Sequence, residues 1–146
     1  MRIAVLSDSH DNISNLERLL PRLQDAGMLI FCGDLCAPFS LETLARGFSG
    51  PVHVTLGNND VSLAVPCGQI EVEGHKVAFV HEPLFAEGLA ALGRFDAVFF
   101  GHSHQREVRK LGKTLLANPG EVMGRLGQPG CGIYDTAARA FAHIDI

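Results

Sequence analysis

Residue types that bind metal ions occur in five short segments of this chain, and each segment follows an apolar run. The segments are Asp8-Ser9-His10, Gly33-Asp34, Gly57-Asn58-Asn59-Asp60, His81 and Gly101-His102-Ser103-His104. Carboxylate, amide and imidazole groups without thiolate suit divalent transition metals. Each segment alone has a plainer interpretation, because Asp-x-His and Gly-Asp also occur in ordinary turns. Their repetition behind successive apolar runs predicts a metal site.

The spacing within two of these segments places possible ligands in pairs. Asp8 and His10 are two residues apart, and so are His102 and His104. Because residues i and i+2 of an extended chain project to the same side, we expect each pair to face one ion. Glycine permits unusual backbone dihedrals and lets another segment approach closely. It directly precedes three of the possible ligands, at Gly33, Gly57 and Gly101.

For these segments to meet, the apolar runs before them must form neighbouring strands. The first half of the chain alternates, with strands expected over 2–6, 28–32 and 52–56 and helices over 13–23 and 40–46. Asn12 or Ser14 can cap the first helix, and Pro21 is expected to disturb it. The alternation predicts a parallel sheet with right-handed crossovers, whose strand ends deliver the ligands to one small volume.

The second half of the chain has the pattern of hairpins. Residues 69–73 and 76–80 flank Gly74, residues 106–110 and 113–117 flank Leu111-Gly112, and residues 132–135 and 140–146 form a third pair. A helix over 85–92 and a strand over 96–100 are expected between the first two hairpins. We therefore expect an α/β fold of two sheets packed face to face with helices outside, in one domain spanning 1–146.

Composition limits the classes of partner. The net charge is −4 over 146 residues and no run of Lys or Arg occurs, which argues against binding to extended nucleic acid. A small phosphate ester remains compatible, because bound metal reverses the local charge. No signal peptide or membrane span is recognisable, so a cytoplasmic location without membrane association is expected. In that compartment the four cysteines are predicted to be reduced thiols: Cys32, Cys36, Cys67 and Cys131.

From Asp8 to about Gly120 the ordered motifs resemble those of the calcineurin-like metallophosphoesterase superfamily, and most closely its small bacterial and archaeal phosphodiesterase branch. The resemblance implies a four-layer α/β/β/α sandwich of two mixed sheets. It also implies a dinuclear metal centre in which Asp34 bridges both ions. The implied ligands of one ion are Asp8, His10 and His104, and those of the other are Asn58, His81 and His102.

The implied activity is hydrolysis of a small phosphoester, most of all a phosphodiester, by a hydroxide that bridges the two metals, without a covalent phosphoenzyme. The ligand set suits Mn²⁺, which is the first expectation, and also Ni²⁺, Fe and Zn²⁺. The alternative is a non-catalytic scaffold module of the same fold, as in the retromer subunit of this superfamily. The complete ligand set favours the enzyme. A nuclease acting on short oligonucleotides is disfavoured by the acidic balance.

The chain departs from the family pattern at two positions. Asn59 stands where large members have a histidine that can protonate the leaving group, so alkyl esters are expected to react slowly. We count Asn59, Asp60 and His102 as the catalytic positions, with Asp60 either orienting a ligand or making an ordinary loop hydrogen bond. Glu82 follows His81 where many relatives have glycine, and it either places an anion at the substrate entrance or faces water.

The remaining motifs receive plainer interpretations. Asn118-Pro119-Gly120 resembles a segment near the family's site, but the favoured interpretation is a turn after a strand. Three histidines match no motif and are assigned structural or surface roles: His53, His75 and His143. Apolar strand edges near the C-terminal hairpin allow a homodimer.

Overall fold

The strands of the first half form a parallel group, as the alternation of strands and helices predicts. In the computed structural model, which describes residues 1–60 and 65–146, the strands β1 (Arg2–Leu6), β2 (Met28–Phe31) and β3 (Val52–Val54) run parallel. The C-terminal hairpin of β9 (Gly130–Asp135) and β10 (Ala140–Asp145) pairs antiparallel with β1. The order of this first sheet is β10-β9-β1-β2-β3, so β1 lies at its centre.

The second sheet combines two hairpins with one inserted strand. Its order is β4-β5-β6-β8-β7. The strands are β4 (Cys67–Val72), β5 (His75–Val80), β6 (Ala97–Phe99), β7 (Arg106–Leu111) and β8 (Thr114–Pro119). Glu73 and Gly74 form the two-residue turn between β4 and β5, and both have positive φ, as a type I′ hairpin turn requires. The turn between β7 and β8 falls at Gly112-Lys113, one residue later than predicted.

A capping residue and several prolines determine where the helices begin or change geometry. Asn12 caps α1 (Ile13–Leu19), because its side-chain oxygen accepts a hydrogen bond from the Asn15 backbone N–H. The predicted disturbance at Pro21 is confirmed, since the chain continues as the 3₁₀ helix η1 (Leu20–Leu23). The helices α2 (Pro38–Gly47) and α3 (Pro83–Ala91) both start with proline in the first turn, where its missing N–H costs nothing.

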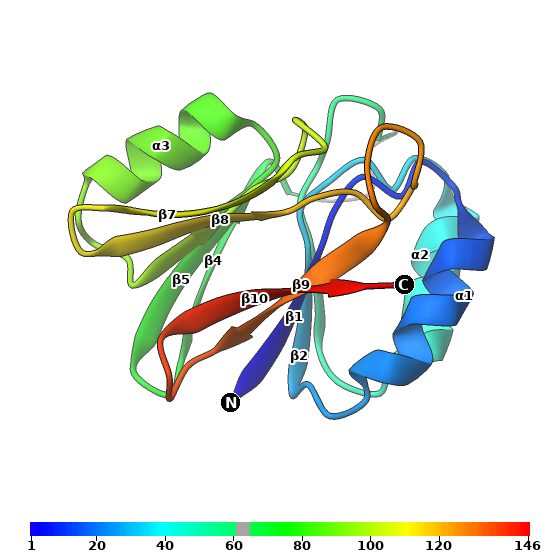
Figure 1. The fold of residues 1–146 in the computed structure, drawn as a ribbon, viewed down its shortest axis with the longest axis horizontal. Coiled ribbons are helices and arrows are strands. Elements are labelled where there is room, and N and C mark those ends of the chain that lie inside the picture. The colour runs from blue at the N-terminus through cyan, green and yellow to red at the C-terminus, as the bar shows by residue number, and fades with distance from the viewer. Residues whose placement is uncertain (61–64) are drawn as a thin grey trace.

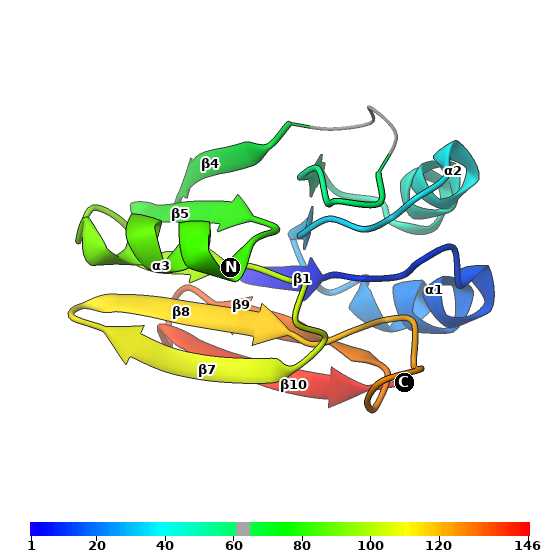
Figure 2. The ribbon, with the colours of Figure 1, turned by 90° about the horizontal axis from the view of Figure 1, so that it is seen from above.

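Three apolar layers hold these elements together as a four-layer α/β/β/α sandwich. The helices α1, η1 and α2 cover the outer face of the first sheet, and α3 covers that of the second (Figures 1 and 2). Between the sheets, Val5 and Ile30 of the first pack with Phe79 and Phe99 of the second. The α/β class and the two mixed sheets are therefore as predicted. Over residues 1–60 and 65–146, no helix is both long enough and apolar enough to cross a membrane.

The topology brings the strand ends to one side of the molecule. The strands β1, β5 and β8 all point in the same direction in Figure 2. The loops that follow are joined by backbone hydrogen bonds, from Asp8 N to Gly33 O (3.0 Å) and from Gly101 N to His81 O (3.1 Å). A third bond, from Val122 N to Ser7 O (3.0 Å), ties in the loop after β8. Loops of both sheets therefore meet in one volume.

Candidate metal centre

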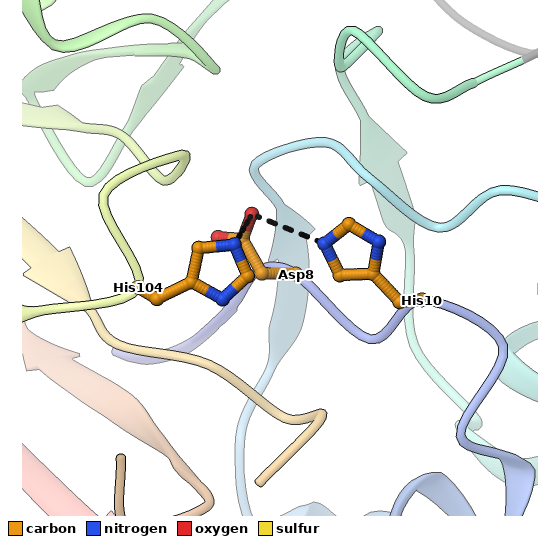
Figure 3. A group of neighbouring side chains, drawn as sticks. All are labelled: Asp8, His10 and His104. Atoms are coloured by element: carbon orange, nitrogen blue, oxygen red, sulfur yellow. Dashed lines mark ion pairs between the residues drawn. The ribbon is translucent and has the colours of Figure 1, made fainter. Parts of the chain in front are cut away.

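A first cluster of possible ligands consists of Asp8, His10 and His104. Asp8 Oδ1 lies 3.9 Å from His10 Nε2 and 3.6 Å from His104 Nε2, so the carboxylate stands between the two imidazoles (Figure 3). Asp8 follows β1 in the first sheet, whereas His104 belongs to the loop after β6 in the second. The first cluster is therefore assembled across the interface between the sheets.

A second cluster consists of Asn58, His81 and His102. Asn58 Oδ1 lies 3.0 Å from both His81 Nε2 and His102 Nδ1, and these two nitrogens are 3.3 Å apart. Three loops that follow different strands thus supply one atom each. His81 is almost fully buried, but the side chain of His102 is 41% exposed. The second cluster consequently opens towards solvent.

Asp34 lies between the two clusters. Its Oδ2 is 3.5 Å from His10 Nε2 and also 3.5 Å from His81 Nε2, so one carboxylate oxygen faces a ligand of each cluster. All seven residues predicted to bind metal are therefore brought together. Their distribution over the two clusters is the one that the family resemblance implies.

The prediction that Asp8 and His10, and likewise His102 and His104, lie in extended backbone is wrong. Asp8, His10, His102 and His104 all have φ between 41° and 66°. His102 belongs to the second cluster and His104 to the first, so this pair does not face one position. Asp34 also has positive φ, at 58°. Left-handed conformations in non-glycine residues are strained and concentrate at functional sites, which is where they occur here.

Glycine supplies the space that this packing requires. A Cβ at Gly101 would overlap Ser7 Oγ, and a Cβ at Gly57 would overlap Asp34 Oδ1. Gly33 combines a φ of 88° with a contact to the His81 ring. The predicted close approach is therefore found before three of the ligand positions.

Hydrogen bonds on the far side of two imidazoles determine which nitrogen faces the centre. His81 Nδ1 donates to Cys32 O at 2.7 Å, and His104 Nδ1 donates to Glu121 Oε2 at 2.5 Å. With the proton on Nδ1, the lone pair of Nε2 points into the respective cluster. A hydrogen bond of this kind both orients a metal-binding histidine and makes it a better ligand.

Glu121 is a functional residue that the sequence analysis missed. Its side chain is fully buried, and Oε1 accepts hydrogen bonds from the backbone N–H groups of Leu126 and Gly127, each at 2.7 Å. Although burial opposes ionisation, the bonds from His104 and these N–H groups lower the pKa of Glu121. Glu121 lies two residues after the end of β8, as Asp8 does after β1, so the strand-end criterion applied to the other segments would have found it.

The two buried aspartates differ in electrostatics. Burial raises the pKa of Asp8 above its ordinary value, despite the nearby His81 and His104. Burial acts on Asp34 in the same direction, but hydrogen bonds from His81 and Asn59 outweigh it and hold the pKa of Asp34 well below its ordinary value. The pKa of His81 is raised, because its bonds to Asp34 and to the Cys32 carbonyl outweigh burial.

Asn59 and Asp60 both hydrogen-bond to Asp34. Asn59 donates its backbone N–H to Asp34 Oδ1 (2.9 Å) and its side-chain N–H to Asp34 Oδ2 (2.7 Å). The Asp60 carboxylate accepts three backbone N–H groups, which belong to Asp34, Cys36 and Gly57. Both side chains position Asp34, and Asp60 makes the loop hydrogen bonds that were one of its two expected roles.

The interpretation of Asn118-Pro119-Gly120 as a turn after a strand is confirmed in part, because β8 ends at Pro119 and Asn118 Oδ1 accepts the Gly120 N–H (2.8 Å). Asn118 lies within β8, is fully buried, and donates from Nδ2 to Gly101 O (2.8 Å) and Ser103 Oγ (3.0 Å). The loop that carries His102 and His104 is thereby attached to the second sheet.

The other expectations concern residues around the centre. Glu82 is close to the centre, with Oε1 at 3.6 Å from His102 Nδ1. The remaining histidines lie outside both clusters, where His53 packs on Phe79, His75 hydrogen-bonds the Tyr134 hydroxyl and His143 hydrogen-bonds Asn118 O. All four cysteines are free thiols.

The donor atoms fit divalent cations. Ligand atoms at about 2.1 Å from a shared ion lie roughly 3.0–3.4 Å apart, depending on coordination geometry. The separations in the second cluster are 3.0–3.3 Å, and those around Asp8 and Asp34 are 3.5–3.9 Å. Asp8 Oδ1 and His10 Nε2 are buried without any hydrogen-bond partner, which is costly unless a further group satisfies them. A cation between them would do so.

Comparison with known proteins agrees with this geometry. Residues 1–139 match the calcineurin-like phosphoesterase superfamily domain, and the chain belongs to this family. It is 26% identical to phosphodiesterase MJ0936 of Methanocaldococcus jannaschii, over 99% of this chain and 98% of the relative.

Solved structures extend the comparison. The structure of an archaeal phosphodiesterase superimposes with a TM-score of 0.92 at 25% identity, covering all of both chains. Vps29 of Entamoeba histolytica, solved with Zn²⁺, superimposes with a TM-score of 0.76 at 20% identity, over 92% of this chain and 86% of Vps29. That second likeness concerns the fold. Both archaeal relatives are named as phosphodiesterases, which are phosphoric ester hydrolases.

Proposed function

We propose that this chain is a dinuclear metal-dependent phosphodiesterase. The first cluster would hold one divalent cation, the second cluster the other, and Asp34 would contact both. The observation that carries the proposal is the position of Asp34 Oδ2, at 3.5 Å from His10 Nε2 and 3.5 Å from His81 Nε2. The family match over residues 1–139 supports a single domain spanning 1–146.

Bound cations at these positions would activate a water and neutralise charge on the phosphoryl group. The protein's own residues determine where the substrate lies. His102 and Asn58 stand at the exposed side of the centre, so a phosphoester would approach from there. Asp34 is held in place by Asn59, and His104 by Glu121, so these ligands need little rearrangement when substrate binds.

Leaving-group dependence follows from Asn59. Its backbone N–H and one side-chain N–H donate to Asp34, and an amide does not donate a proton to an alkoxide near neutral pH. Because general acid catalysis contributes about 10²–10⁴-fold, alkyl esters should react more slowly than aryl esters by a factor in that range. Equal rates for matched alkyl and aryl esters would contradict this role of Asn59.

The test is hydrolysis of bis(p-nitrophenyl) phosphate by the purified protein with Mn²⁺, Ni²⁺, Fe²⁺ or Zn²⁺, with Mn²⁺ expected to be the best activator. His102→Ala should abolish turnover. His53→Ala removes an imidazole outside both clusters and should leave it unchanged. Metal binding without turnover of any ester would instead support the scaffold alternative, and a protein that binds no divalent cation would end the proposal. The free thiols support a cytoplasmic location.

A further inference from the structure

An apolar cavity of about 540 Å³ opens beside the second cluster. One wall is the face of α3 that carries Leu84, Phe85 and Leu92, and the opposite wall contains Leu56 and Pro66. The α3 side chains are 79%, 69% and 59% exposed, respectively, so a helix that covers the second sheet with its other face leaves large apolar groups uncovered here. Exposed apolar groups that gather around a concavity of this size are typical of a ligand site.

The cavity is continuous with the candidate metal centre. His81 and Glu82 belong to its lining. His81 Nε2 is 3.0 Å from Asn58 Oδ1, and Glu82 Oε1 is 3.6 Å from His102 Nδ1. The helix α3 starts directly after Glu82, so the chain runs from a ligand of the second cluster into the wall of the cavity within a few residues. The cavity therefore lies next to the second cluster.

The lining also specifies which chemical groups fit the cavity. Among residues 1–60 and 65–146, those that line the cavity apart from His81 and Glu82 are apolar residues, glycine and one cysteine, with neither Lys nor Arg. The carboxylate of Glu82 at its entrance repels a second phosphate or a carboxylate. An uncharged aryl or alkyl group gains from burial against these walls without losing hydrogen bonds to water.

Resting on the proposed phosphodiesterase function, we propose that this cavity is a subsite for one uncharged, apolar substituent of the phosphodiester. It receives the group that remains on the phosphate, and it makes the enzyme selective for diesters with an aryl or longer alkyl substituent. A phosphomonoester has no group to place there, and a polynucleotide would bring further charge towards Glu82.

A substrate series tests the subsite with constant leaving-group chemistry. Methyl, butyl and phenyl p-nitrophenyl phosphates all release p-nitrophenolate, and only the second substituent differs. We expect kcat/KM for the phenyl ester to exceed that for the methyl ester by about 30-fold, in proportion to the apolar area removed from water. The butyl ester should lie between them.

The substitution Phe85→Ser tests the same subsite by changing the protein instead of the substrate. It should lower kcat/KM for the phenyl ester about tenfold more than for the methyl ester, because only the larger substituent fills the cavity. Val108→Ser is the matched control, since Val108 is a 45% exposed aliphatic residue on β7 outside the cavity lining. It should leave both values unchanged.

The outcomes separate this inference from the function on which it rests. Hydrolysis of all three esters with the same kcat/KM would overturn the subsite and leave the phosphodiesterase intact. Hydrolysis of none of them would overturn both. A second copy of the chain could also cover this face. The oligomeric state is therefore measured by sedimentation velocity as part of the test. A wild-type dimer that Phe85→Ser converts to a monomer would assign the cavity to self-association and overturn the subsite.

Discussion

The two ligand clusters of the candidate metal centre are built from similar residues but in different surroundings. The first cluster has a carboxylate of its own in fully buried Asp8, and its histidines His10 and His104 are only 22% and 14% exposed. The second cluster has no carboxylate of its own, and both Asn58 and His102 are exposed. Burial and charge favour retention of a cation in the first cluster, whereas openness favours access of substrate to the second.

The groups that accept hydrogen bonds from His104 and His81 also differ in charge between the two clusters. Glu121 places a buried carboxylate against His104, but His81 is supported by a neutral backbone carbonyl. On the open side, Glu82 lies 3.6 Å from His102, and both His81 and Glu82 line the apolar cavity. We therefore expect two cations to bind with distinct affinities, the tighter one in the first cluster.

Removing the carboxylate of Asp34, which both clusters share, should weaken both cation sites and should have the largest effect on turnover. Asp34→Asn weakens ligation on both sides, and since a misplacement of about 1 Å can cost about 10²-fold in rate, diester turnover should fall by more than that. Elemental analysis after gel filtration should find fewer than two bound cations. Asp25→Asn, at the surface beside Arg2, is the control. Retention of two cations by Asp34→Asn would mean that Asp34 is not shared.

Glu121→Gln should affect the first cluster alone. The amide has a single acceptor oxygen for the donors of His104, Leu126 and Gly127, and it loses the charge. Changes of this kind behind a ligand cost about 10–100-fold in metal affinity. Isothermal titration should show weakening of the tighter site only. Glu82→Gln is the matched substitution on the other side and should spare the tighter site. Equal effects of the two substitutions would remove the distinction between the clusters.

The second cluster should lose its cation as the pH falls. A protonated imidazole cannot bind metal, and the raised pKa of His81 places this competition at a higher pH than for an ordinary histidine. Affinity should be full above that pKa and decrease by about tenfold per pH unit below it. Titrations with Mn²⁺ between about pH 5.5 and 8 would measure this. His81→Asn, which has no titrating group at this position, should give a flatter profile, and a pH-independent wild type would contradict the assignment.

Asp8→Asn should stabilise the metal-free protein, which is the smallest expected effect. The folded-state pKa of Asp8 is raised, so its ionised form opposes folding at neutral pH and this penalty disappears as pH falls below the unfolded-state value. The neutral amide should raise the free energy of unfolding at pH 7, measured with urea. Asp60→Asn should have the opposite sign, because its carboxylate accepts three N–H groups. Destabilisation by both substitutions would show that Asp8 carries no such penalty.

Local sequence patterns were sufficient to predict the helices and strands. The periodicity of Ile13 to Leu23, the capping residue Asn12 and the hairpin glycine Gly74 each act within a few residues, and all three predictions are confirmed. Boundaries shifted by one or two residues, as with α3, which starts at Pro83 because proline favours the first helical turn.

The chemical types of the seven ligand positions, and their places behind strands, could also be predicted from the amino-acid sequence, because parallel strands must end at the same side of a sheet. The directions of the side chains could not be predicted in this way. They depend on left-handed backbone at Asp8, His10 and Asp34, which is stable only under the packing and hydrogen bonds of the folded loops. The roles of Glu121 and Asn118 and the cavity along α3 were likewise decided by tertiary structure, because each depends on contacts between segments far apart in the chain.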